Sequence, residues 1–329
     1  MKGAISLGMI GVELVSEFVD SVVHTGFIKD DKPLSVMLIA APESGKTSVT
    51  QDRDCTSVLT VSDMIGSGLL EELQAKPGIR HVIINDMVSI MAHKDVTNAR
   101  TFAILNMLSE EGLGKIVMPG GLAKNLGGRQ VGFICCIPSQ LAGDNRRWWN
   151  STGFASRLLP FNYVYSERLL LQIKRTIIMT GLYKNKRVEK KEGVNPIVEF
   201  SVSIKKSESA DIQAIADSIS KRLTEQGLRR GKQLRSLAAG RALSFNRRQV
   251  NSSDIDFLWK IEEHIDFENP KILEFGKADS EKKKKSKHKG ATNAKQPNGS
   301  QATDIHIQNN DAVVEVPSPG SDRINQSQS

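Results

Sequence analysis

The pattern of apolar and polar positions predicts strands in the first half of the chain. Residues 34–39, 82–84 and 131–137 are short, largely apolar runs, the last of them ending at Pro138. Apolar runs of this length are typical of parallel strands that are buried on both faces. Stretches with helical periodicity lie between them, notably residues 97–111. Strands that alternate with helices predict an α/β protein, a three-layer αβα sandwich with a parallel sheet.

Helical periodicity predominates on either side of this region. In residues 1–30 the apolar positions form one broad face, with Glu13, Glu17 and Asp20 mostly opposite. Further helices are predicted at 169–179, 209–226, 231–246 and 252–265, the last with an N-cap at Ser252, Ser253 and Asp254. The chain therefore divides into an N-terminal helix (1–30), a core (31–166), a small all-helical domain with its connecting segment (167–275) and a tail (276–329).

Composition narrows the class of protein. The tail carries much of the formal net charge of +8, with lysines at 282–285, 287 and 289, and it has almost no aromatic residues. It cannot bury enough apolar surface to offset the entropy of ordering, so we expect it to be disordered. No uncharged apolar stretch is long enough to cross a membrane, and acidic residues interrupt the apolar run near the N-terminus. We expect a cytoplasmic protein that does not engage a membrane.

The three cysteines do not form a metal-binding pattern. Cys55 stands alone, and Cys135 and Cys136 are adjacent within an apolar run. Neighbouring residues of a strand point to opposite faces, so this pair cannot serve one tetrahedral metal site. We interpret both as small apolar residues of a buried strand.

A phosphate-binding turn follows the first predicted strand. A strand, then Gly45-Lys46-Thr47 and a helix, is the context of a P-loop, in which backbone N–H groups surround phosphates. Lys46 would reach the β- and γ-phosphates of ATP, and the Thr47 hydroxyl would bind Mg²⁺. Ala40 stands where the pattern has its first glycine. The candidate nucleotide-binding residues are Pro42, Glu43, Ser44, Gly45, Lys46, Thr47 and Ser48.

The second strand ends in Asn85-Asp86, which fits the Walker B outline of an apolar strand ending in an acid. The chemistry needs one carboxylate near Mg²⁺ and usually a second to orient the attacking water. Either Asp86 holds the metal with Thr47, or Asp86 is the base and Asn85 serves the metal side. An Asp86 that only caps a turn is a third interpretation. A single acid leaves slow hydrolysis, or binding without turnover, open.

With these motifs the chain resembles the AAA+ family of ring-forming ATPases, closest in look to its MCM-like helicase branch. The resemblance covers about residues 30–265. It implies a P-loop ATPase core followed by a helical lid, and an oligomer that remodels a macromolecule, most readily nucleic acid.

The resemblance also implies roles for polar residues beyond the P-loop. Ser139, or Gln140, falls at the sensor 1 position after the third strand, and Ser156-Arg157 looks like the segment that carries the arginine finger. Leu158 replaces the Phe expected next. Arg235 lines up best with the sensor 2 arginine of the lid, and Arg230 is the second choice.

Two further segments have competing interpretations. Arg146-Arg147-Trp148-Trp149 could stack on nucleic acid, but paired tryptophans are more often half-buried packing. The glycine-rich segment 118–129 lies where this branch projects pore hairpins, which makes Lys124 and Arg129 candidates for contacting a polymer. A plain glycine-rich connection is the slightly favoured alternative.

The P-loop predicts binding of ATP and Mg²⁺, and the resemblance implies an ATPase that forms a homo-oligomer. Two alternatives remain. One is a nucleotide-gated assembly or binding module with little hydrolysis. The other is a DNA-binding protein whose P-loop is a relic and whose basic tail binds DNA.

Overall fold

The computed structural model describes residues 11–51, 53, 56–93, 95–117, 123–180, 198–223 and 227–273. The tail predicted at 276–329 and the lone Cys55 lie outside these residues. Within the part described, no helix is both long and apolar enough to cross a membrane.

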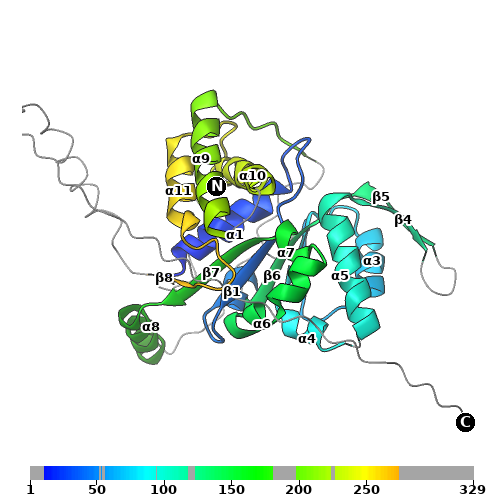
Figure 1. Cartoon of the computed structure of the whole chain (residues 1–329), viewed down its shortest axis with the longest axis horizontal. Helices are drawn as coiled ribbons and strands as arrows, with labels where there is room; N and C mark the ends of the chain where they lie inside the picture. Colours follow the sequence, from blue (N-terminus) through cyan, green and yellow to red (C-terminus); the bar gives the residue numbers. More distant parts are fainter. Residues whose placement is uncertain are drawn as a thin grey trace, which may run out of the picture. The chain divides into compact units, whose positions relative to one another are not determined.

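A six-stranded parallel sheet forms the centre of the fold (Figure 1). Its strand order is β2-β3-β6-β1-β7-β8, so β6 lies between β1 and β3 although it comes later in the chain. The sequence pattern identified β1, β3 and β6 and missed the other three. The bounds are β1 Val36–Ala40, β2 Val58–Val61, β3 His81–Ile84, β6 Gly132–Pro138, β7 Leu159–Tyr165 and β8 Lys271–Leu273.

Helices cover both faces of this sheet, as an α/β sandwich requires (Figure 1). Residues alternate between the faces along β1: Val36 and Leu38 belong to one apolar cluster, and Met37 and Ile39 to the other. The first cluster includes side chains of α1 (Glu13–Thr25), α2 (Lys46–Gln51), α8 (Glu167–Thr180), α9 (Lys206–Leu223), α10 (Leu228–Ser244) and α11 (Ser252–Glu262). The second includes side chains of α3 (Gly66–Ala75), α4 (Met87–Met91), α5 (Asp95–Glu110), α6 (Ser139–Ser151) and α7 (Phe154–Arg157).

The adjacent cysteines follow the same alternation. Cys135 belongs to the second cluster and Cys136 to the first, and both are buried as free thiols. The prediction that they face opposite sides of one strand is confirmed.

The predicted helices are present within the described residues, with shifted ends, and residues 1–10 of the helix predicted at 1–30 lie outside those residues. The helix expected at 209–226 begins three residues earlier, as α9, and the helix expected at 231–246 begins three residues and ends two residues earlier, as α10. The cap of α11 is Asn251, one residue before the predicted stretch, because its extended backbone lets its side chain accept from the Ser253 N–H. Asp254 completes a capping box by accepting from the Asn251 N–H at 2.9 Å.

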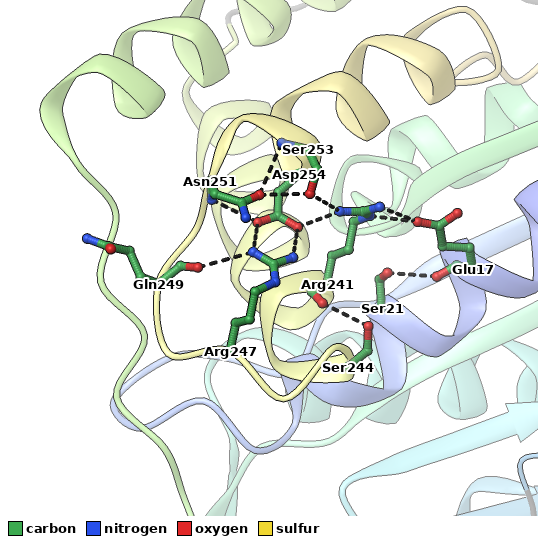
Figure 2. Close-up of polar contacts among 9 residues, drawn as sticks. All are labelled: Glu17, Ser21, Arg241, Ser244, Arg247, Gln249, Asn251, Ser253 and Asp254. Carbon is green, nitrogen blue, oxygen red and sulfur yellow. Dashed lines mark hydrogen bonds and ion pairs between the residues drawn. The ribbon is translucent and has the colours of Figure 1, made fainter. Parts of the chain in front are cut away.

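A buried charge network joins α1, α10 and α11 (Figure 2). The Asp254 carboxylate has no exposed surface and accepts from the guanidinium groups of Arg241 and Arg247 at 2.6–2.7 Å. Arg241 also pairs with Glu17 on α1 at 2.6 Å. Removing one partner of a buried ion pair leaves an uncompensated charge, so this network fixes α10 against its neighbours.

A separate antiparallel hairpin contradicts the prediction of a plain glycine-rich connection. Strands β4 (Leu113–Val117) and β5 (Ala123–Arg129) pair, with Leu113 opposite Arg129 and Val117 opposite Ala123. Gly127 and Gly128 adopt positive φ angles, which their missing Cβ permits within a strand. The glycines that suggested a loop instead allow a twisted, irregular strand.

Candidate functional site

The turn between β1 and α2 forms a compact loop around the Lys46 ammonium group. Lys46 Nζ donates to the carbonyl oxygens of Ala40 and Ala41, each at 2.7 Å, and lies 3.3 Å from Ser44 Oγ. Glu43 and Gly45 adopt left-handed backbone conformations, with φ of 60° and 77°. Turns of this kind direct successive N–H groups to one side and make anion-binding concavities.

Lys46 lies close to the ends of two neighbouring strands. Partial burial lowers its pKa below the ordinary value, while Cys136 on β6 and Asp86 after β3 act in the opposite direction. Burial raises the pKa of Cys136 to about 12, so the thiol is neutral near pH 7. The influence of Asp86 on Lys46 places the end of β3 near the turn.

Asn85 and Asp86 point to different partners. The Asn85 side chain faces α2, where its Oδ1 lies 2.9 Å from the Thr50 hydroxyl, one turn after Lys46. Asp86 is exposed, and its Oδ1 accepts from the Val88 N–H at 2.9 Å. Asp86 therefore caps α4, as one interpretation expected. It also lies near Lys46, and its roles as metal ligand or base stay predictions.

Parallel strands bring Ser139 to the same edge of the sheet. It begins α6 directly after β6, and β6 is hydrogen-bonded to both β1 and β3. Ser139 therefore falls between the Lys46 turn and Asp86. Ser139 is half-buried and Gln140 is exposed, so the serine is the better placed of the two.

Two tyrosines that sequence reasoning missed hold the turn from the other side. The hydroxyls of Tyr163 and Tyr165 on β7 both donate to the Ser44 carbonyl, at 3.1 and 2.5 Å. The available signal was the period-two spacing of Phe161, Tyr163 and Tyr165, which places all three on one face of a strand.

Arg157 lies at the opposite edge of the sheet. It precedes β7, and Leu159 pairs with Val36 at the start of β1, whereas the Lys46 turn follows the end of β1. Five residues of β1 separate the two edges by about 13 Å. Arg157 therefore does not meet the turn of its own chain.

At that edge a carboxylate bridges two arginines. Glu110 Oε2 lies 2.9 Å from Arg157 Nε, a charge contact without the alignment of a hydrogen bond. Its other oxygen accepts from Arg229 at 2.9 Å, and Arg229 also donates to the Ser156 hydroxyl at 2.6 Å. Arg157 Nη1 donates to the Gly153 carbonyl at 2.6 Å. All three charged side chains are partly exposed.

The two sensor 2 candidates lie on the same side of the molecule as Arg157. Arg230 is buried, and its guanidinium donates to the Leu158 carbonyl and to Gln233 Oε1, both at 2.8 Å. It packs α10 against α7, which disfavours the second choice. Arg235 is exposed, and its neighbour Ser236 donates to Asp31 just before β1. The role of Arg235 stays a prediction.

The aromatic pair after Arg147 belongs to the core. Trp149 has no exposed surface, Trp148 is half-buried, and Phe102 contacts Trp148 edge to face. Arg146 pairs with Glu268 and lies over the Phe267 ring. The packing interpretation holds for Trp149, because a buried indole cannot stack on nucleic acid.

Two cations of the hairpin, Lys124 and Arg129, were predicted to contact a polymer. Arg129 donates to the carbonyl oxygens of Leu73 and Lys76 at the end of α3. Desolvation and the nearby Arg80 lower its pKa below the ordinary arginine value. Arg129 therefore anchors the base of the hairpin. The side chain of Lys124 lies outside the described residues, and its predicted role is untested.

Among the described residues, no group of three or more His, Cys, Asp or Glu side chains could hold a metal ion. No protein-family model matches the chain, and no curated protein matches it in sequence.

Proposed function

We propose that this protein binds ATP·Mg²⁺ in the turn between β1 and α2. The observation that carries the proposal is the Lys46 ammonium group, held against the Ala40 and Ala41 carbonyls in a turn with two left-handed residues. A cation beside a concave run of N–H groups suits a polyphosphate. The strained backbone at Glu43 supports a functional role, because such conformations gather at ligand-binding sites.

The residues around the turn also suit Mg²⁺. Thr47 is exposed at the start of α2, and Asp86 lies near Lys46. Mg²⁺ is usually held by one or two carboxylates together with phosphate oxygens and water, so these two side chains would be enough from the protein. When bound, the ion would neutralise phosphate charge.

Turnover, in this proposal, needs a second copy of the chain. Arg157 lies at the edge of the sheet away from the turn, where it can approach the phosphates of a neighbour but not its own. A guanidinium group stabilises charge developing on the transferred phosphoryl group. We therefore propose an oligomeric AAA+-type ATPase with a helical lid. The β4–β5 hairpin supports action on a polymer such as nucleic acid, since it presents exposed Lys115 and Val117.

Calorimetry with Lys46→Ala tests the binding site. We expect wild-type protein to release heat on titration with ATP and Mg²⁺, and the variant to bind on the order of a hundredfold more weakly. Lys76→Ala is the matched control, since that lysine is exposed and its ammonium group pairs with its helix neighbour Glu72. Equal affinity of wild type and Lys46→Ala would overturn the assignment.

A nucleotide-gated module without appreciable hydrolysis is the second candidate. The observation in its favour is that Asp86 caps α4 while its neighbour Asn85 is neutral and faces Thr50. Single-turnover kinetics under assembling conditions separates the two functions. ATP recovered unchanged after hours supports the gated module, and conversion to ADP supports the ATPase.

A further inference from the structure

The Ser44 carbonyl group is held in place by an unusual pair of donors. Tyr163 and Tyr165 come from the same face of β7 and both reach this one oxygen, at 3.1 and 2.5 Å. Tyr163 has no exposed surface and Tyr165 is half-buried. Burial strongly raises the pKa of Tyr163, so its hydroxyl keeps its proton and remains a donor. Ser44 itself is 6% exposed.

Because the peptide bond is planar, the two hydrogen bonds to the Ser44 carbonyl also fix the orientation of the turn. The peptide group that joins Ser44 to Gly45 is planar, and in its trans form the C=O and N–H point in opposite directions. Holding the Ser44 carbonyl toward β7 therefore aims the Gly45 N–H away from the buried tyrosines. Because the carbonyl accepts two hydrogen bonds, rotation of this peptide would break both together.

The backbone on either side needs such support. Glu43, immediately before Ser44, has a φ of 60°, a conformation that residues with a Cβ adopt rarely, and Gly45 has a φ of 77°. Strained backbone persists where surrounding contacts determine it. The tyrosine hydroxyls are contacts of this kind, and they come from a rigid strand of the sheet.

We infer that Tyr163 and Tyr165 are positioning residues for phosphate binding, which act by fixing the Ser44–Gly45 peptide with its N–H directed to the ligand. The inference rests on the proposed function, because it names residues that prepare the same turn. Neither tyrosine contacts the ligand in this scheme. They lower the cost of binding by organising the turn beforehand.

The test is calorimetric titration of ATP with Mg²⁺ into Tyr163→Phe, Tyr165→Phe and the double variant. Each substitution removes one hydroxyl and keeps the ring in the core. We expect about threefold weaker binding for Tyr165→Phe and about tenfold for the double variant, the scale of one or two hydrogen bonds. Ser35→Ala is the matched control, because it removes a buried hydroxyl contact from the other edge of the same sheet, the one to the Phe133 N–H. Its affinity should equal that of wild type.

Binding is compared at a temperature where near-ultraviolet circular dichroism shows each variant fully folded. A purely structural role would lower the melting temperature without changing the dissociation constant, and that result overturns the inference. If the double variant does not fold, Tyr165→Phe decides alone: threefold weaker binding supports the inference and unchanged binding rejects it. Lys46→Ala is titrated in parallel. If it loses binding while the tyrosine variants do not, this inference fails and the proposed function stands.

Discussion

The two edges of the central sheet hold their charged groups in different ways. At the carboxyl ends of the strands, Lys46, Asp86 and Ser139 converge because three parallel strands end side by side. At the amino ends, Arg157 and Arg229 share one carboxylate, Glu110, which comes from the end of α5. The first edge offers one cation beside a concave turn. The second offers two guanidinium groups that are already paired within the chain.

This difference bears on how the molecule would work. Under the proposed function, a phosphate bound at the carboxyl edge would lie about 13 Å from the amino edge, the length of β1, so one chain would not supply both Lys46 and Arg157 to it. Joining the amino edge of one copy to the carboxyl edge of the next would complete it. Such a head-to-tail contact generates a ring or a filament.

Among the substitutions that distinguish the two edges, that of Arg157 should change ATP turnover the most. We expect Arg157→Ala to bind ATP like wild type, because the residue is remote from its own turn, but to lose about 10³-fold in turnover under assembling conditions. Phosphate release at saturating ATP is the measurement.

Mixing two inactive variants makes this test sharper. In an assembly of Lys46→Ala and Arg157→Ala, some junctions combine an intact turn from one copy with an intact Arg157 from the other. Activity should return on mixing. If each variant alone is inactive and the mixture is too, Arg157 does not act between copies.

Lowering the pH should destabilise the fold through a histidine at the amino edge. His81 begins β3 at the amino edge, fully buried, with Nε2 at 3.2 Å from the Leu34 carbonyl. Burial lowers its pKa from 6.5 to about 4. Between those values the unfolded chain binds a proton that the folded protein does not. Stability that is complete above pH 6.5 therefore decreases as the pH falls, by about 2 kcal/mol at pH 5.

Urea unfolding of wild type and His81→Gln at pH 7 and pH 5 measures this contribution. His24 and His264, whose pKa values burial also lowers, remain in both proteins, so the difference in pH dependence isolates His81. Equal pH dependence in the two proteins would contradict the assignment. If the variant is too unstable to compare, nuclear magnetic resonance titration of the His81 ring in wild type gives its pKa directly.

Substitution of Glu110 should have the smallest effect on stability and on turnover. Its ion pairs with Arg157 and Arg229 are partly exposed, so Glu110→Gln should change the free energy of unfolding by less than about 1 kcal/mol. Turnover should remain within about threefold of wild type, since an ion pair of this size carries little energy. A loss of turnover comparable to that of Arg157→Ala would mean that Glu110 positions the arginine. Thermal unfolding and phosphate release measure the two quantities.

Local patterns predicted much of the candidate site, because its residues are either adjacent in the sequence or directly follow a strand. Gly45, Lys46 and Thr47 are read directly from the chain, and Asp86 and Ser139 each follow an apolar run. Parallel strands end at one edge, so strand ends are a reliable guide to neighbours. The tyrosines escaped notice because they contact Ser44 across 119 and 121 residues, and no local pattern encodes that pairing.

The order of residues alone determined the α/β alternation, the helical part that follows it and the turn that carries Lys46, since each depends on periodicity or on adjacent residues. Folding decided the rest. It placed β6 between β1 and β3, buried Trp149 and Arg230, paired β4 with β5 and separated Arg157 from Lys46. These outcomes depend on which distant segments exclude water from one another, and a linear pattern does not specify that.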